Sequence, residues 1–414
     1  MIRPLHCLTS LLGIVPLLLT SLTYAQSITD STSRAEQIDA YDLAKKWFGI
    51  SIAPRSDSGL GTKPQWAVLP SLNYQPATGI TGGAILTSSF YPKNTPHTRL
   101  STVHLYGGYS QYNQVLATAL GNIWTPGHGF NIQVDWRFYN FPTTTYGLGS
   151  HTQLANASDV DYNHVRLHQT VYKAVGLDYM VGIGYTLDRH FDILNGNSAG
   201  QTTDYARYGL NRQSTSSGII VGLLRDRRGN PNNPEGGSYL LAQFRTYLSE
   251  LGSSTNYQAL WLDYRKYIPL GGRLEKQLAL WSFNWVTFGG NVPYLDLPAT
   301  GWDTYNNTGR GYAMGRLRGP SLYYAEAEYR TQLTANGLIG GVLFANAQTI
   351  GPWPGSIPKG LEVGSQQRNV QIWPGFGGGL RVKVNKSART NLAIDYGFGA
   401  GGSKGLYFNL NEVF

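Results

Sequence analysis

The chain has almost no cysteine and few charges. Its one cysteine, Cys7, stands near the N-terminus of the 414 residues, so the remainder can form neither a disulfide nor a thiolate metal site. Only 14% of the residues are charged, and the basic ones that give a formal net charge of +9 are dispersed along the chain. Because no nucleic-acid-binding motif accompanies them, we expect no nucleic acid among the partners.

Long apolar runs are missing as well. The longest, within 8–19, follows Arg3 and is shorter than the roughly 20 apolar residues that a membrane-spanning helix needs. Small residues around Ala25 follow it, as at a signal-peptide cleavage site. We therefore expect residues 1–25 to be a secretory signal peptide that contains Cys7.

Glycine and aromatic residues are abundant. The chain has 51 glycines, 28 tyrosines and 10 tryptophans, which would be unusual in a soluble domain. A membrane β-barrel with a polar lumen and two aromatic girdles needs this mixture.

From Trp66 onward, short segments alternate between apolar and polar residues. In 130–138, Phe130 and Trp136 share one face and Asp135 and Arg137 the other, as successive strand side chains do. Lengths of about 9 to 11 residues fit tilted membrane strands. The sixteen segments are 66–74, 79–90, 98–109, 111–120, 129–139, 162–172, 176–188, 217–225, 237–248, 257–268, 278–289, 321–330, 338–349, 376–384, 390–398 and 405–414.

The connections sort by length. The four longest, 140–161, 189–216, 290–320 and 350–375, all follow odd-numbered segments. Outer-membrane barrels have long outer loops and short periplasmic turns, whereas a soluble β-sandwich has no reason to sort loops in this way. The pattern predicts an all-β fold, a 16-stranded antiparallel transmembrane β-barrel in the bacterial outer membrane with both termini periplasmic.

The two ends of the chain differ. Segment 405–414 alternates and ends on Phe414, the aromatic terminus that outer-membrane barrels present for assembly. Residues 26–65 are polar, with one expected helix within 33–49 that lies either at the periplasmic rim or in the lumen. The expected organisation is a signal peptide, this short segment, and a barrel over 66–414.

One long loop carries a distinctive motif, Gly309-Arg310-Gly311-Tyr312. A glycine-flanked arginine can fold into the lumen, where it needs a carboxylate partner. By strand alternation Glu326, Glu328 and Arg330 point inward, and Glu328 is the best-placed partner. The alternative is an ordinary surface loop.

At these residues the chain resembles the Omp85 superfamily of outer-membrane assembly and secretion barrels. The resemblance implies that Arg310, Gly311 and Tyr312 form the motif of the sixth outer loop, with Glu328 as one acidic partner in the lumen. The second acidic position of the family corresponds to Asn346, which leaves a neutral hydrogen bond there. The family's periplasmic repeat domains have no counterpart in the short segment 26–65, so we expect a barrel-only member.

The resemblance implies a role in inserting or translocating proteins, or lipids, at the outer membrane. A passive porin and a docking barrel for partner lipoproteins are the alternatives. The expected partners are outer-membrane lipid together with client outer-membrane proteins or lipoprotein subunits, and the oligomeric state stays open. We expect no cofactor, no bound metal and no enzymatic activity: Gly401 to Gly405 match a nucleophile-elbow pattern only as a hairpin loop, and His164 and His168 lie about 13 Å apart along a strand.

The seam of the barrel is expected to be weak. Closure pairs the first strand with the last, which ends on Phe414. Pro70 in the first strand has no N–H to donate, and such residues belong at weakly paired edges. The glycine-rich approach at 399–405 loses extra entropy when it is ordered. We expect fewer backbone hydrogen bonds here than between any other two strands.

Overall fold

The computed structural model describes residues 37–49, 62, 64, 66–75, 78–92, 99–195, 212–272, 274–351 and 370–414. The expected signal peptide and most of segment 26–65 lie outside these residues. The described helix and strands all belong to one compact unit, Ile38–Phe414.

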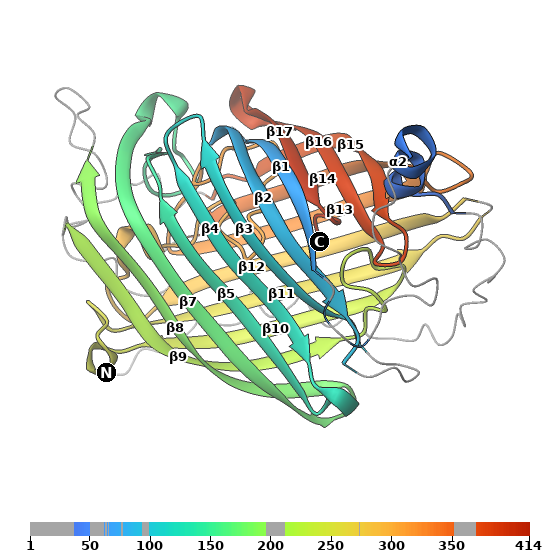
Figure 1. Ribbon diagram of the computed structural model, residues 1–414. Helices are drawn as coiled ribbons and strands as arrows, with labels where there is room; N and C mark the ends of the chain where they lie inside the picture. The colour runs from blue at the N-terminus through green and yellow to red at the C-terminus, as the bar shows by residue number, and fades with distance from the viewer. Residues whose placement is uncertain are drawn as a thin grey trace, which may run out of the picture. The chain divides into compact units, whose positions relative to one another are not determined.

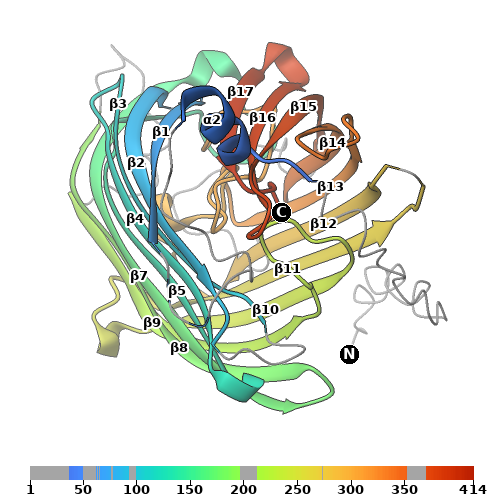
Figure 2. The same ribbon diagram turned by 45° about the vertical axis from the view of Figure 1, so that its right-hand side comes forward.

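Sixteen antiparallel strands form a barrel wall around a lumen (Figures 1 and 2), so the predicted fold class is confirmed. Each strand pairs with the next along the chain, as the alternation and short turns predict. The strands are β1 (Trp66–Gln75), β2 (Gly79–Phe90), β3 (Ser101–Ser110), β4 (Val115–Trp124), β5 (Phe130–Asn140), β7 (Ser158–Gly176), β8 (Tyr179–Asn195), β9 (Gln213–Asp226), β10 (Gly237–Tyr247), β11 (Tyr257–Pro269), β12 (Lys276–Phe288), β13 (Ser321–Gln332), β14 (Ile339–Gly351), β15 (Trp373–Asn385), β16 (Thr390–Gly399) and β17 (Lys404–Leu410).

The β7–β8 hairpin is longer than the sequence predicts. Its strands have 19 and 17 residues, more than the roughly 9 to 11 that cross a bilayer. The turn residues Leu177 and Asp178 both have positive φ, 51° and 65°, as a tight hairpin turn matched to strand twist requires. The short strand β6 (Thr143–Thr145), which was not predicted, pairs with the start of β7.

The two faces of the wall differ as the alternation predicts. On β5, Phe130 and Trp136 are exposed on the outer face, whereas Asn131, Asp135 and Arg137 are buried on the lumen side. On β5, apolar side chains therefore face the surroundings of the barrel and polar ones face the lumen.

The first and last strands meet without a ladder. β1 pairs with β2, where Pro70 lies opposite Ala84, and β17 pairs with β16. β1 and β17 lie side by side (Figure 1), yet their described residues form no ladder with each other. An edge of each strand is therefore left without a strand partner.

The end of the chain departs from the predicted strand 405–414. β17 ends at Leu410, and the next residue, Asn411, has a φ of 72°, which breaks the alternation. Val413 and Phe414 are buried, and the ring of Phe414 stacks on Trp281 with 5.1 Å between centroids. The expectation that the alternation continues to Phe414 is therefore wrong: the last residues turn into the lumen.

The expected helix lies at one rim of the barrel. Helix α2 (Ala40–Phe48) begins after Asp39, whose carboxylate accepts a hydrogen bond from the Asp42 N–H at 3.1 Å, as in an N-terminal cap. Asp42 pairs with Lys386 at 2.9 Å, and the Ile38 N–H donates to the Asn336 carbonyl at 3.0 Å. These contacts fix α2 to the turns that precede β14 and β16. No helix in the described part of the chain is long and apolar enough to cross a membrane.

Candidate functional site

The loop between β12 and β13, residues 289–320, folds into the lumen. Its Arg310 side chain is only 1% exposed and Tyr312 only 2%. The loop therefore lies against the inner wall, and the alternative of an ordinary surface loop does not apply.

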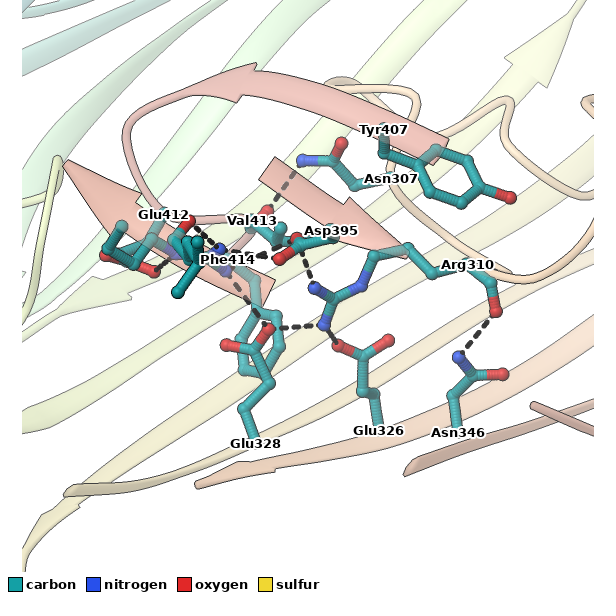
Figure 3. A network of polar contacts seen from close by, with 12 residues as sticks. Asn307, Arg310, Glu326, Glu328, Asn346, Asp395, Tyr407, Glu412, Val413 and Phe414 are labelled. Carbon is teal, nitrogen blue, oxygen red and sulfur yellow. Dashed lines mark hydrogen bonds and ion pairs between the residues drawn. The ribbon is translucent and has the colours of Figure 1, made fainter. Parts of the chain in front are cut away.

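Arg310 contacts three carboxylates from two different strands. Its guanidinium donates to Glu326 and Glu328 of β13 and, at 2.7 Å, to Asp395 of β16. The guanidinium carbon also lies 3.7 Å from the centroid of the Phe344 ring on β14. The arginine thus joins β13 to β16 inside the lumen (Figure 3).

The ion pairs continue beyond Arg310. Arg330 donates to the second oxygen of Glu328 at 2.7 Å, and Arg381 donates to Asp395 at 2.6 Å and to Glu412 at 2.8 Å. Every one of these side chains is buried. Such a network is held together because each buried charge has an opposite charge and a hydrogen bond.

Electrostatics keep Arg310 charged. Burial alone lowers the pKa of Arg310, but the carboxylates of Glu326, Glu328 and Asp395 outweigh burial and hold the pKa well above its usual value. The contact therefore does not titrate on the arginine side at physiological pH.

Glycines make room for the motif. Gly311 has a φ of 103°, and a Cβ there would lie 2.7 Å from the main-chain carbon of Phe398. On the facing strands, a Cβ at Gly375 would lie 2.8 Å from the Arg310 carbonyl oxygen, and one at Gly397 2.8 Å from the Gly311 nitrogen. The loop tip and the wall approach backbone to backbone, which only glycine allows.

The hydroxyl groups of Tyr407 and Tyr312 hold the Gly311 tip of the loop against the wall. The Gly311 N–H donates to the hydroxyl of Tyr407 on β17 at 2.9 Å, and this hydroxyl donates to the Tyr312 carbonyl at 2.9 Å. The Tyr312 hydroxyl donates to the Pro374 carbonyl and accepts from the Ala400 N–H at 2.8 Å. The motif is thus joined to the last strand as well as to β13.

The other predicted partner, Asn346, contacts the main chain of the motif and not the Arg310 guanidinium. Its side-chain amide donates to the Arg310 carbonyl at 3.0 Å. The additional carboxylates are Glu326 and Asp395, and sequence reasoning did not identify either as a partner. Inward parity marked Glu326, whereas only the fold brings Asp395, 85 residues away, to the arginine.

The rest of the loop is bound to the opposite wall. Arg316 donates to Thr152 through its hydroxyl at 2.6 Å and its carbonyl at 2.8 Å, and Arg137 of β5 donates to Asn306 at 2.9 Å. Asn307 donates to the Val413 carbonyl at 2.7 Å. The loop therefore spans the lumen from β5 to the C-terminal residues.

A second buried cluster lies on β7 and β8. His164 and His168 both contact Asp188, at 3.0 and 2.6 Å, and the His164 ring stacks on His190 with 4.2 Å between centroids. Although the two histidines lie far apart along β7, their side chains converge on one carboxylate of β8. The described part of the chain contains no group of such side chains arranged to hold a metal ion.

These features define an antiparallel transmembrane β-barrel of the outer-membrane type, with an arginine-tipped loop fixed inside its lumen. The Omp85 superfamily domain matches residues 101–414, and the chain belongs to that superfamily. It is accordingly an integral outer-membrane protein. No curated protein matches the sequence closely enough to count as a relative.

Solved structures agree with this fold. BamA from Haemophilus ducreyi lacking POTRA domains 1–3 has a TM-score of 0.52 at 14% identity, covering 92% of this chain and 81% of the other. CdiB from Acinetobacter baumannii has a TM-score of 0.50 at 11% identity, covering 84% of this chain and 65% of the other. CdiB from Escherichia coli has a TM-score of 0.51 at 13% identity, covering 84% of this chain and 63% of the other. At these identities the likeness concerns the fold.

Proposed function

We propose that this barrel aids the insertion or translocation of proteins at the outer membrane, and that it opens between β1 and β17 to do so. The long loops face outward and both termini face the periplasm. Superfamily membership supports the first part of the proposal. Clients are unfolded outer-membrane proteins, bound directly or through lipoprotein subunits.

The observation that carries the proposal is the edge at the seam. β17 has a strand partner on one side only among the described residues, and such an edge presents N–H and C=O groups to which another chain can pair. A passive porin gains nothing from this edge. An insertase uses it as a template for a client strand.

The loop supports the same mechanism, because it contacts the last strand and the residues that follow that strand. Tyr407 of β17 binds Gly311 and Tyr312, and Asn307 binds Val413. The loop thereby holds β17 in place while its free edge stays available.

Reconstituted protein tests the proposal. Liposomes that contain this barrel should accelerate the folding of a small outer-membrane test barrel relative to empty liposomes. Liposomes with the variant Gly311→Ala, in which the loop tip is displaced, should accelerate it less. Ion conductance without any acceleration would instead identify a porin.

A further inference from the structure

A pocket of about 370 Å³ lies beside the seam. One side is the inner wall of β2 to β4, and the other side is the terminal strands β16 and β17. Its apolar lining includes Ile85, Tyr106, Leu116, Leu392, Phe408 and Leu410.

The terminal strands line this pocket with the face that is not the lumen face. Tyr407 points into the lumen, where it binds the 289–320 loop, so by strand alternation Phe408 points to the opposite face. Leu410 and its cross-strand partner Leu392 share that face. In the other strands this face is the one turned toward lipid.

The opposite side of the pocket is a lumen face. Tyr106 and Ile85 are cross-strand partners, and Leu116 lies opposite Tyr139 of β5 on the lumen side. The outward face of β16 and β17, with Leu392, Phe408 and Leu410, therefore lies across the pocket from apolar residues of the inner wall. The pocket continues the hydrocarbon-facing surface into the barrel.

The unpaired seam supplies an entry. Ser71 of β1 and Asn409 of β17 both line the pocket, and the described residues of these two strands form no ladder with each other. No hydrogen-bonded wall therefore separates the pocket from the surroundings of the barrel at this place.

The polar side chains of the lining are almost all uncharged. Carboxylates are absent from the described lining residues, and the one charged side chain, Arg137, is already paired with Asp135 at 2.6 Å. Thr81 also lines the pocket and is 1% exposed, and its buried hydroxyl has no hydrogen-bond partner among the described residues. An apolar cavity of a few hundred Å³ with a small number of polar atoms is typical of small-molecule sites.

We propose that this pocket binds an acyl chain of a membrane phospholipid, which enters from the bilayer through the β1–β17 seam. The chain contacts Leu116 and Ile85 on one side and Phe408 and Leu410 on the other.

Photolabelling tests this site. The wild-type protein is reconstituted in bilayers of phosphatidylcholine that carries a diazirine near the end of one acyl chain, and the labelled residues are identified by mass spectrometry. We expect labels on the lumen-side residues Tyr106 and Leu116 in addition to the outward-facing residues of the wall. Labels confined to outward-facing residues would overturn the proposal.

Two variants at adjacent positions of β4 make the result specific. Leu116→Trp fills the pocket, whereas Ala117→Trp adds the same ring to the outer face of the same strand. We expect Leu116→Trp to lose the label on Tyr106 and Ala117→Trp to keep it. Equal labelling in both variants would contradict the proposal, and the wild-type experiment decides the question alone if Leu116→Trp does not fold.

A free fatty acid with the same diazirine distinguishes the source of the chain. Labelling of Tyr106 by the phospholipid supports the proposal. Labelling by the fatty acid alone would show that the pocket takes a free acid and would overturn entry of a phospholipid from the bilayer.

Discussion

At the scale of single residues, we expect the position of the 289–320 loop to depend on Arg310. Among the described residues, its guanidinium alone contacts Glu326, Glu328 and Asp395 together. Arg310→Ala leaves buried carboxylates with fewer partners, and breaking such a pair costs about 3–5 kcal/mol. We expect the 289–320 loop to be released and to be cleaved faster in limited proteolysis. Arg227→Ala, which removes an exposed ion pair with Asp178, is the control and should change little.

A second prediction at this scale concerns backbone contact. Gly311→Ala places a Cβ 2.7 Å from the Phe398 backbone at a φ of 103°, so the loop tip must move away from β16. Gly127→Ala has a comparable φ of 77° but nothing within 4 Å, and therefore carries the conformational strain without the clash. Faster proteolysis of the 289–320 loop in Gly311→Ala alone is the expected result. The same change in both variants would show that loss of the contact with Phe398 is not responsible.

At the scale of elements, the strands were largely predictable and their ends were not. The alternation in β5 and β13 is regular, because one face of each strand meets lipid or the outer surface and the other meets charges in the lumen. Local pattern could not show that β17 ends at Leu410, since Phe414 is held by Trp281 and Arg330 from strands far away in sequence.

The same limit applies to the candidate site. Alternation along β13 was sufficient to place Glu328 inside, and the glycine-flanked motif was sufficient to select Arg310. Asp395 could not be assigned as a partner because its contact with Arg310 depends on how β16 and the loop are placed in the barrel, which no local spacing reports.

The inward turn of the C-terminal residues gives a third prediction. Phe414→Ala removes a buried ring, and such a change in a packed core costs about 3–5 kcal/mol. We expect the heat-induced unfolding of protein refolded in detergent, followed by gel mobility, to begin at a lower temperature. Phe376→Ala removes a ring that is 61% exposed on the outer face and should have a smaller effect. Equal effects would place Phe414 outside the lumen.

At the scale of the whole molecule, orientation gives a fourth prediction. Residues 141–157 and 289–320 lie at the same end of the barrel, because each connects a strand to the next in the same direction. Ala155→Cys should therefore react with a membrane-impermeant thiol reagent on intact cells. Leu177→Cys, in the turn at the other end, should react only after the outer membrane is made permeable. The reverse pattern would overturn the proposed topology.

The central claim is that the barrel works by opening between β1 and β17. Its most direct test is to lock the seam with a short, reducible thiol cross-linker between Ser71→Cys and Asn409→Cys, which line one pocket. The control is the pair Ser89→Cys and Thr102→Cys, already opposite each other on β2 and β3. We expect the locked seam to abolish the folding of a test client in liposomes, reduction to restore it, and the cross-linked control to stay active. Full activity of the barrel with its seam locked would contradict the account.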